Sequence, residues 1–194
     1  MNIVNVGYDS TNYYVLEQNR KRLLIDVGFP GTLPKLRASL KRAGITLQGI
    51  PYFCVTHFHP DHAGLVQELK AEGVKHLIFQ EQLAAVPQMK VYVKPDSSYV
   101  EIRLHDSLQL TTAESRAWLA AKLSFAGEVV STPGHSDDSV SLVLDEGIAF
   151  TGDLTPPDSS AEGQAEVIRQ SWDKLRALKV LRIYPGHGPI RPLP

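Results

Sequence analysis

Residues 55–64 read VTHFHPDHAG and follow an apolar run, which predicts a short strand that ends at this stretch. The stretch holds three of the chain's seven histidines. In an extended chain alternate side chains point the same way, so His57 and His59 are predicted to project together and to bind one metal ion. Asp61 and His62 follow where the chain turns toward the next helix, so they can face a second, adjacent ion. Imidazole nitrogen and carboxylate oxygen suit zinc, and also iron or manganese.

Three further turns offer the ligands that this stretch alone would lack. STPGHSDDS places His135, AFTGDL places Asp153 and YPGHGP places His187 in a turn. Each of them follows a predicted apolar strand and a glycine, and loops at strand ends are where open sheets gather their functional groups. We therefore predict that these three side chains complete the metal site. His76 and His105 occupy no such turn and are expected to have structural roles.

The rest of the chain alternates short apolar strands with helical segments. Leu33, Leu36 and Leu40 are spaced by three and four residues, which predicts a helix over 33–43. Two sheets packed together with helices outside, an α/β class, suit this order of elements. Residues 80–112 give no clear prediction beyond loops that shape a substrate pocket. Predicted strands cover 3–6, 12–16, 22–27, 51–56, 75–79, 128–131, 140–144, 148–150 and 180–184; predicted helices cover 33–43, 65–72, 113–125 and 162–178.

The composition is that of an ordinary globular chain, with 194 residues, 43% apolar residues and a formal net charge of -1. This near-neutral balance argues against a broad basic surface for nucleic acid or an anionic membrane, so neither partner is expected. No secretory signal is visible and no apolar segment is long enough to span a bilayer, so the expected location is the cytoplasm. Cys54 is the single cysteine, so no intramolecular disulfide can form, and its apolar surroundings predict a buried side chain.

An ordered set of residues resembles the signature of the metallo-β-lactamase superfamily: Thr56-His57-Phe58-His59-Pro60-Asp61-His62, then His135, Asp153 and His187. The resemblance implies a four-layer αβ/βα sandwich, with two mixed β-sheets and helices outside, in a single domain over residues 1–194. It also implies the ligand roles: His57, His59 and His135 for the first metal, Asp61, His62 and His187 for the second, and Asp153 as the bridge. Asp26 matches the aspartate that orients a histidine ligand in the superfamily.

The chemistry that the resemblance implies is hydrolysis assisted by two divalent metal ions. Zinc is the expected metal, with iron or manganese as alternatives. A water shared by two close metals loses a proton near neutral pH, and the bridging hydroxide would attack a carbonyl or phosphoryl centre. Asp61 would orient that hydroxide or take up a proton. The expected substrate is a small molecule: an ester, a thioester or a lactone.

Other members of the superfamily differ from this chain in specific features. True zinc β-lactamases usually carry a signal peptide and lack the bridging aspartate. Glyoxalase II enzymes add a C-terminal helical domain that binds glutathione, for which we expect no room because seven residues follow His187. Two alternatives stay open: a mononuclear iron oxidoreductase similar to the persulfide dioxygenases, and a phosphodiesterase or nuclease of the same superfamily. The residues indicate no oligomeric state, although a homodimer is common in the superfamily.

Two stretches near the predicted site depart from the pattern that many members share. Gly64 is followed by Leu65, where many members have a second glycine. After His135 the chain has Ser136-Asp137-Asp138-Ser139, where many members have a small Pro-Gly turn. Neither departure removes a predicted ligand, and both are expected to alter substrate access.

Overall fold

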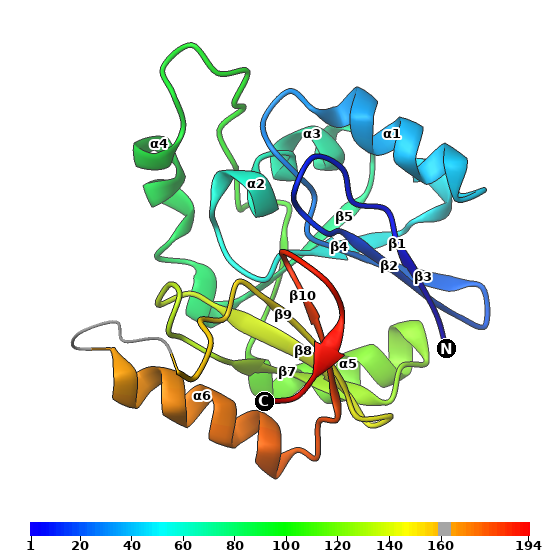
Figure 1. The fold of residues 1–194 in the computed structure, drawn as a ribbon. Coiled ribbons are helices and arrows are strands. Elements are labelled where there is room, and N and C mark those ends of the chain that lie inside the picture. The colour runs from blue at the N-terminus through cyan, green and yellow to red at the C-terminus, as the bar shows by residue number, and fades with distance from the viewer. Residues whose placement is uncertain (159–163) are drawn as a thin grey trace.

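A computed structural model describes residues 1–158 and 164–194 as two β-sheets with helices packed on them (Figure 1). The first sheet contains, in spatial order, β1 (Asn2–Asn5), β2 (Tyr14–Gln18), β3 (Lys21–Ile25), β4 (Tyr52–Cys54), β5 (Lys75–Phe79) and β6 (Leu108–Leu110). The second contains β11 (Arg191–Pro192), β10 (Arg182–Pro185), β9 (Ile148–Gly152), β8 (Val140–Leu144) and β7 (Gly127–Ser131). Both sheets combine parallel and antiparallel pairs, so the predicted two mixed sheets are confirmed.

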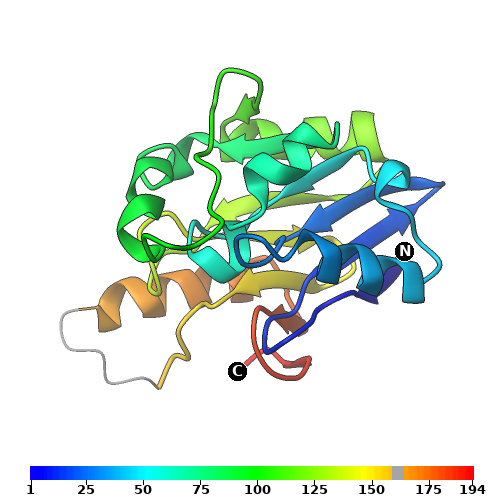
Figure 2. The same cartoon turned by 90° about the horizontal axis from the view of Figure 1, so that it is seen from above.

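The helices pack mainly on the outer faces of the sheets: Figure 1 shows α6 on the opposite side of the molecule from α1 and α3, and Figure 2 shows the same arrangement from above. One longer helix, α5, connects the edge strand of the first sheet to the edge strand of the second, and contributes Leu119 and Leu123 to the core between the sheets. None of the described helices is both long and apolar enough to cross a membrane. The helices are α1 (Leu33–Arg42), α2 (Pro60–Ala63), α3 (Val66–Ala71), α4 (Met89–Tyr92), α5 (Thr112–Leu123) and α6 (Ala165–Ala177).

Successive side chains of the strands pack into different layers of the fold. In β8, Leu142 and Leu144 belong to the core between the sheets, whereas Val143 packs with the residues of α6 on the outer face. In β3, Leu24 packs with α1 and α3, while its two neighbours face the other sheet. Because successive side chains of a strand point to opposite faces, a strand that is apolar throughout requires cover on both sides. The four-layer arrangement follows from such strands.

Most predicted elements are present, with ends shifted by a few residues. The predicted strands at 75–79 and 140–144 match β5 and β8, and the predicted helix at 33–43 matches α1 to within one residue. The helix predicted over 162–178 is observed as α6 from Ala165, and residues 162 and 163 lie outside the described residues. The burial predicted for Cys54 is confirmed. Among the α-helices and strands of the described residues, α2, α4, β6 and β11 were not predicted.

Candidate metal centre

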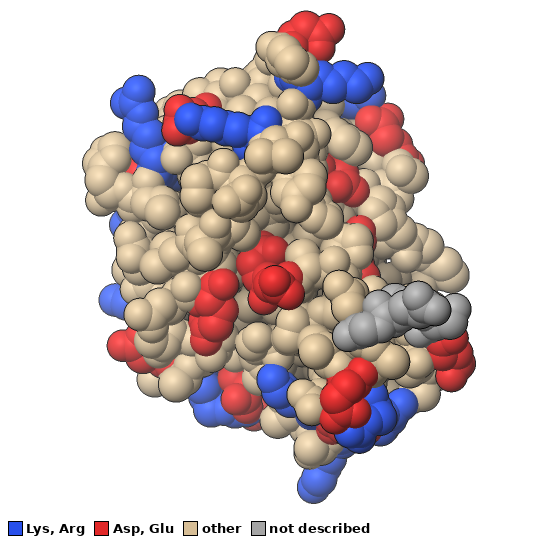
Figure 3. All heavy atoms as spheres, turned by 90° about the vertical axis from the view of Figure 1, so that its left-hand side faces the viewer, with Lys and Arg blue, Asp and Glu red and all other residues tan. Residues whose placement is uncertain are grey.

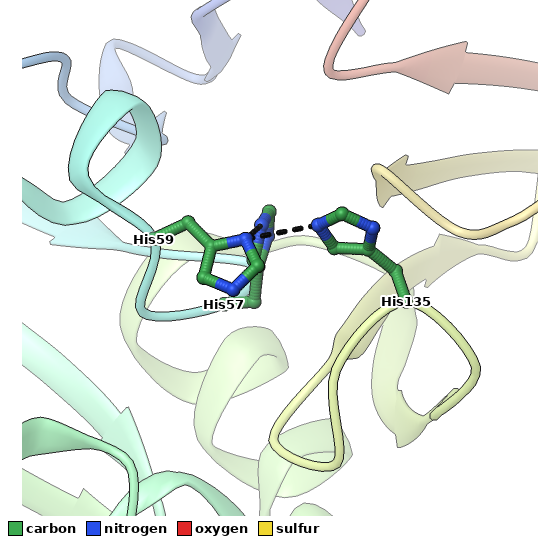
Figure 4. Close-up of side chains that lie close together, drawn as sticks. All are labelled: His57, His59 and His135. Carbon is green, nitrogen blue, oxygen red and sulfur yellow. Dashed lines mark hydrogen bonds between the residues drawn. The ribbon is translucent and has the colours of Figure 1, made fainter. Parts of the chain in front are cut away.

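Three histidine side chains from two loops point toward one another (Figure 4). His57 and His59 lie between β4 and α2, and His135 lies between β7 and β8. His57 Nε2 is 3.1 Å from His59 Nδ1, and His135 Nε2 is 2.9 Å from that same nitrogen. Tetrahedral coordination at a zinc–nitrogen distance of roughly 2.0–2.1 Å places neighbouring nitrogens about 3.3 Å apart. The three histidines therefore have the spacing of ligands to one ion.

Four side chains form a second group beside the first. Asp61 and His62 belong to α2, Asp153 directly follows β9, and His187 follows β10. His62 Nε2 is 3.3 Å from Asp61 Oδ2 and 3.3 Å from Asp153 Oδ1. His187 Nε2 is 3.1 Å from Asp61 Oδ2 and 3.3 Å from Asp153 Oδ2. Within each group the ligand atoms all lie within 4.8 Å of one another, so this second group can hold an ion of its own.

Asp153, a member of the second group, lies where the two groups meet. Its Oδ2 atom is 3.7 Å from His135 Nε2 and 3.3 Å from His187 Nε2, so one carboxylate oxygen approaches a member of each group. The structure thus brings together all seven side chains that the sequence indicated as ligands, in one group of three and one group of four that includes Asp153. That they bind metal stays a prediction.

The donor set fits a cation. Among the described residues, His62 Nε2 and Asp153 Oδ1 are buried side-chain atoms without a hydrogen-bond partner, although they lie 3.3 Å apart. Leaving a buried polar atom unsatisfied costs about 1–3 kcal/mol, so such atoms are rare and call for a reason. A cation bound by both atoms would satisfy them, because each is of a type that coordinates divalent metals.

Asp26 orients His62 from behind the centre. Its side chain is almost fully buried, and its Oδ1 accepts a hydrogen bond from the Thr56 amide at 2.7 Å. Its Oδ2 lies 2.9 Å from His62 Nδ1. When Nδ1–H donates to this carboxylate, the lone pair of Nε2 faces the centre, which is the tautomer that a metal ligand needs. The observed contact matches the orienting role that the resemblance implies for Asp26.

The loop between β1 and β2 supports two more of the predicted ligands. The buried Thr11 donates its hydroxyl to Asp61 Oδ2 at 3.2 Å. The Ser10 carbonyl oxygen accepts from His187 Nδ1 at 2.7 Å, so Nε2 of that histidine also faces the centre. Neither Thr11 nor Ser10 was predicted from the sequence to have a role. No local pattern shows which loop will meet a ligand that is 50 or 177 positions away.

Asp138 and Gln82 hold the loop that carries His57 and His59. The Phe58 amide donates to Asp138 Oδ2 at 2.7 Å, and Gln82 Nε2 donates to the Val55 carbonyl at 3.0 Å. Both side chains are buried. In the sequence the Asp137-Asp138 pair is visible only as a departure from the common pattern, because its contact to Phe58 depends on tertiary structure.

Two glycines allow the strand ends to approach the centre. A Cβ atom at Gly186 would lie 2.4 Å from Asp153 Oδ1 and 2.5 Å from His62 Cε1. A Cβ atom at Gly152, where φ is +53°, would lie 2.3 Å from Thr56 Oγ1. These glycines directly precede His187 and Asp153. The glycine in front of each of these predicted ligands is therefore a steric requirement of the close approach.

The charges of the centre favour a bound cation. Burial, and then the neighbouring His62 and His135, lower the pKa of His57 well below its usual range, so this imidazole stays neutral. Burial also opposes protonation of His62. The neighbouring carboxylates of Asp26, Asp153 and Asp61 outweigh this effect and raise the pKa of His62. Burial opposes ionisation of Asp61, yet the contact with His62 holds the pKa of Asp61 well below its usual range. A positive charge among these carboxylates is stabilised, whether a proton or a metal ion supplies it.

His76 and His105 lie outside both groups. His76 is fully buried, stacks on Phe53 with ring centroids 4.9 Å apart, and places Nδ1 3.0 Å from Ser107 Oγ. Burial lowers the pKa of His76 to about 3, so it is neutral near pH 7. His105 is exposed. These surroundings agree with the structural role expected for His76.

Comparisons with known proteins show the family of the chain. The family profile described as the metallo-beta-lactamase superfamily matches residues 6–187. The beta-lactamase-like protein 2 homolog of Caenorhabditis elegans is 30% identical in an alignment of length 185 that covers 93% of this chain and 56% of that protein. The hydroxyacylglutathione hydrolase of Alkalilimnicola ehrlichii is 31% identical in an alignment of length 189 that covers 95% of this chain and 64% of that protein. The chain thus spans less than two thirds of the length of either relative.

A solved structure shows the same fold. The crystal structure of a metallo-beta-lactamase family protein from Thermus thermophilus is similar with a TM-score of 0.72 at 21% identity, over 98% of this chain and 73% of that one. At this identity the likeness concerns the fold alone. Because the family profile covers nearly the whole chain and the sheets have the matching architecture, this chain belongs to the metallo-beta-lactamase superfamily.

Proposed function

We propose that this chain is a single-domain, dinuclear metal-dependent hydrolase that acts on a small ester, thioester or lactone. The observation that carries the proposal is the convergence of seven ligand-type side chains in two adjacent groups, with Asp153 between them. The relative named hydroxyacylglutathione hydrolase acts, by its name, on an acyl group carried by glutathione. That relative supports an acyl compound as the substrate class.

The residues of the centre have separable tasks. Two divalent cations bound there, zinc in our proposal, would polarise a carbonyl oxygen and lower the pKa of a water molecule. Asp61 is 18% exposed whereas the neighbouring His62 is fully buried, so its carboxylate meets solvent and substrate and can orient the attacking water or accept its proton. Asp26 keeps His62 in one tautomer, and the low pKa of His57 keeps its lone pair free.

The proposal is tested by replacing the residue between the two groups. Asp153→Ala should lower the bound metal from about two equivalents per chain to one or fewer. It should also lower hydrolysis of an activated thioester by at least about a hundredfold, since even supporting residues cost about 10- to 100-fold at metal sites. His105→Ala is the matched control, because it removes an exposed histidine outside both groups.

The same preparations separate the proposal from its alternatives. Undiminished turnover by Asp153→Ala would refute the proposal. One iron per chain, with oxygen consumed on a persulfide, would indicate the oxidoreductase instead. Hydrolysis of phosphodiesters without hydrolysis of esters, thioesters or lactones would indicate the nuclease.

A further inference from the structure

The predicted metal centre borders two cavities that share His135 in their walls. The first, cavity 1, measures about 380 Å³ and is also lined by His59. The second, cavity 2, measures about 480 Å³ and is also lined by Asp153, His187 and Arg191. Each cavity therefore contains ligand-type residues of the centre. A substrate whose carbonyl group lies at the centre would extend into at least one of them.

Cavity 1 is lined by acidic side chains, and none of the described lysines or arginines lines it. Asp138 is buried and accepts the hydrogen bond from the Phe58 amide, so its charge supports the loop. Glu81 and Asp137 are exposed, and they are the carboxylates that a ligand in the cavity meets. On the face of the molecule that carries α4, Asp and Glu side chains gather near the middle, while Lys and Arg side chains lie mainly toward its upper and lower parts (Figure 3).

An aromatic side chain completes the wall beside the metal centre. Tyr92, at the end of α4, is 55% exposed and lines cavity 1. Its ring centroid lies 5.0 Å from that of His59, with 67° between the ring planes. An exposed aromatic ring near carboxylates is a recurrent setting for binding ammonium groups, because the ring face carries negative potential. Acidic and aromatic side chains thus line the same cavity as His59, one of the predicted metal ligands.

We propose that the substrate carries an ammonium group that binds in cavity 1, against Glu81, Asp137 and Tyr92, while its scissile carbonyl lies at the metal centre. This inference rests on the proposed hydrolase function and names the substrate class. For a thioester, the oxygen of one water bonds to the acyl carbon and the carbon–sulfur bond breaks. The thiolate takes one proton of that water, and the other is released to solvent from the carboxylic acid. The carboxylates of cavity 1 repel a substrate with an anionic group at the same position.

Three thioesters of N-acetylcysteamine test the charge preference. They carry the 4-(trimethylammonio)butanoyl group, its neutral isostere 5,5-dimethylhexanoyl, and the anionic glutaryl group. We expect kcat/KM of the metal-loaded protein to be about tenfold higher for the cationic than for the neutral substrate, from the attraction of two partly solvated carboxylates, and lowest for the anionic one. Because the first two substrates have the same shape, their ratio reports charge alone.

Charge-neutralising variants assign the preference to cavity 1. Glu81→Gln keeps the oxygen that accepts from the Thr112 hydroxyl, a bond of 2.8 Å, and removes the charge. Asp137→Asn does the same at the second position. Each variant should reduce the cationic-to-neutral ratio about threefold, and the double variant should bring it near one. Glu146→Gln is the matched control: it removes an exposed carboxylate in the turn between β8 and β9, away from the end of β9 that carries Asp153, and should keep the ratio.

A binding measurement makes the inference independent of turnover. The N-methylamides of the cationic and neutral acids are titrated into the metal-loaded protein and the same variants, with calorimetry as the readout. Tighter binding of the cationic amide, lost in the double variant, supports the inference even if no thioester is cleaved, a result that would count only against the proposed function. Thioester hydrolysis with no preference for the cationic group, or equal binding of the two amides, would overturn the inference and leave the hydrolase proposal standing.

Discussion

Single hydrogen bonds outside the ligand set decide how the ligands face the centre. Asp26 and the Ser10 carbonyl each contact the Nδ1 atom of a histidine, and so direct its Nε2 atom inward. Thr11 fixes the carboxylate of Asp61. Such supporting contacts commonly contribute about 10- to 100-fold in metal affinity. Removing one of these contacts should therefore lower the affinity for metal more clearly than it lowers the stability of the fold.

Thr11→Val removes the hydroxyl donor and keeps the shape of the side chain. We expect the affinity for the second equivalent of zinc to fall about tenfold, because Asp61 loses its fixed orientation, while the first equivalent binds as before. Thr11→Ser keeps the donor and should resemble the wild type. Competition with a chromophoric chelator measures both affinities. Wild-type affinity in Thr11→Val, or an equal loss in both variants, would show that the hydroxyl does not position Asp61.

His76 predicts a pH dependence of stability. Its pKa falls from the ordinary 6.5 to about 3 in the folded protein because it is buried, so the unfolded chain binds more protons between these values. The stability that depends on neutral His76 is therefore fully present well above pH 6.5, and it is lost as the pH drops through 6.5 toward 3. At about pH 5.5 the expected loss from this one group is about 1.4 kcal/mol.

The control for this prediction is His76→Phe, which keeps a ring against Phe53 and removes the titrating group. Urea unfolding of both proteins is measured at several pH values in the presence of a chelator, so that metal release does not contribute. The free energy of unfolding should fall less steeply with acid in the variant. Parallel slopes for the two proteins would contradict the assignment.

At the scale of elements, strand direction explains why residues distant in sequence meet. β9 and β10 are parallel neighbours, so Asp153 and His187 follow carboxyl ends at the same edge of one sheet. β3 and β4 are parallel neighbours in the other sheet, which brings Asp26 beside the stretch that follows β4. The centre lies where these two edges face each other.

Gly186→Ala tests how closely these edges must approach. The added Cβ atom would overlap with Asp153 Oδ1 and His62 Cε1, so we expect loss of at least one metal equivalent with little change in far-ultraviolet circular dichroism. Gly188→Ala is the control in the same turn: no atom lies within 4 Å of its added Cβ, although its φ of +77° adds strain. Metal content is measured by elemental analysis. Full metal content in Gly186→Ala would show that the approach tolerates a methyl group.

The elements that the sequence predicted share one property: their signal is local. β9 is a mostly apolar run that ends at Gly152, and Gly186 directly follows β10. The leucine spacing of α1 needs no tertiary information. The elements that it missed, such as α4 with four residues or β11 with two, are too short to carry a periodic pattern. The same limit applies to the site. The ligand-type residues follow strand and glycine patterns, whereas Thr11, Gln82 and Tyr92 acquire their places only when distant loops meet.

At the scale of the whole molecule, the two halves of the chain each supply part of the centre. The stretch after β4 provides His57, His59, Asp61 and His62, and the second half provides His135, Asp153 and His187. The core between the sheets holds these halves together with residues from both. Metal ions bound by residues from both halves would therefore link the facing ends of the two sheets. Folding would then be coupled to metal binding.

Anomalous diffraction from crystals of the zinc-loaded protein is the most direct test of the central claim, that these seven side chains bind two ions. We expect two anomalous peaks in each chain, one among His57, His59 and His135 and the other among Asp61, His62 and His187, with Asp153 in contact with both. A single peak in the fully loaded protein, or peaks away from these residues, would contradict the account.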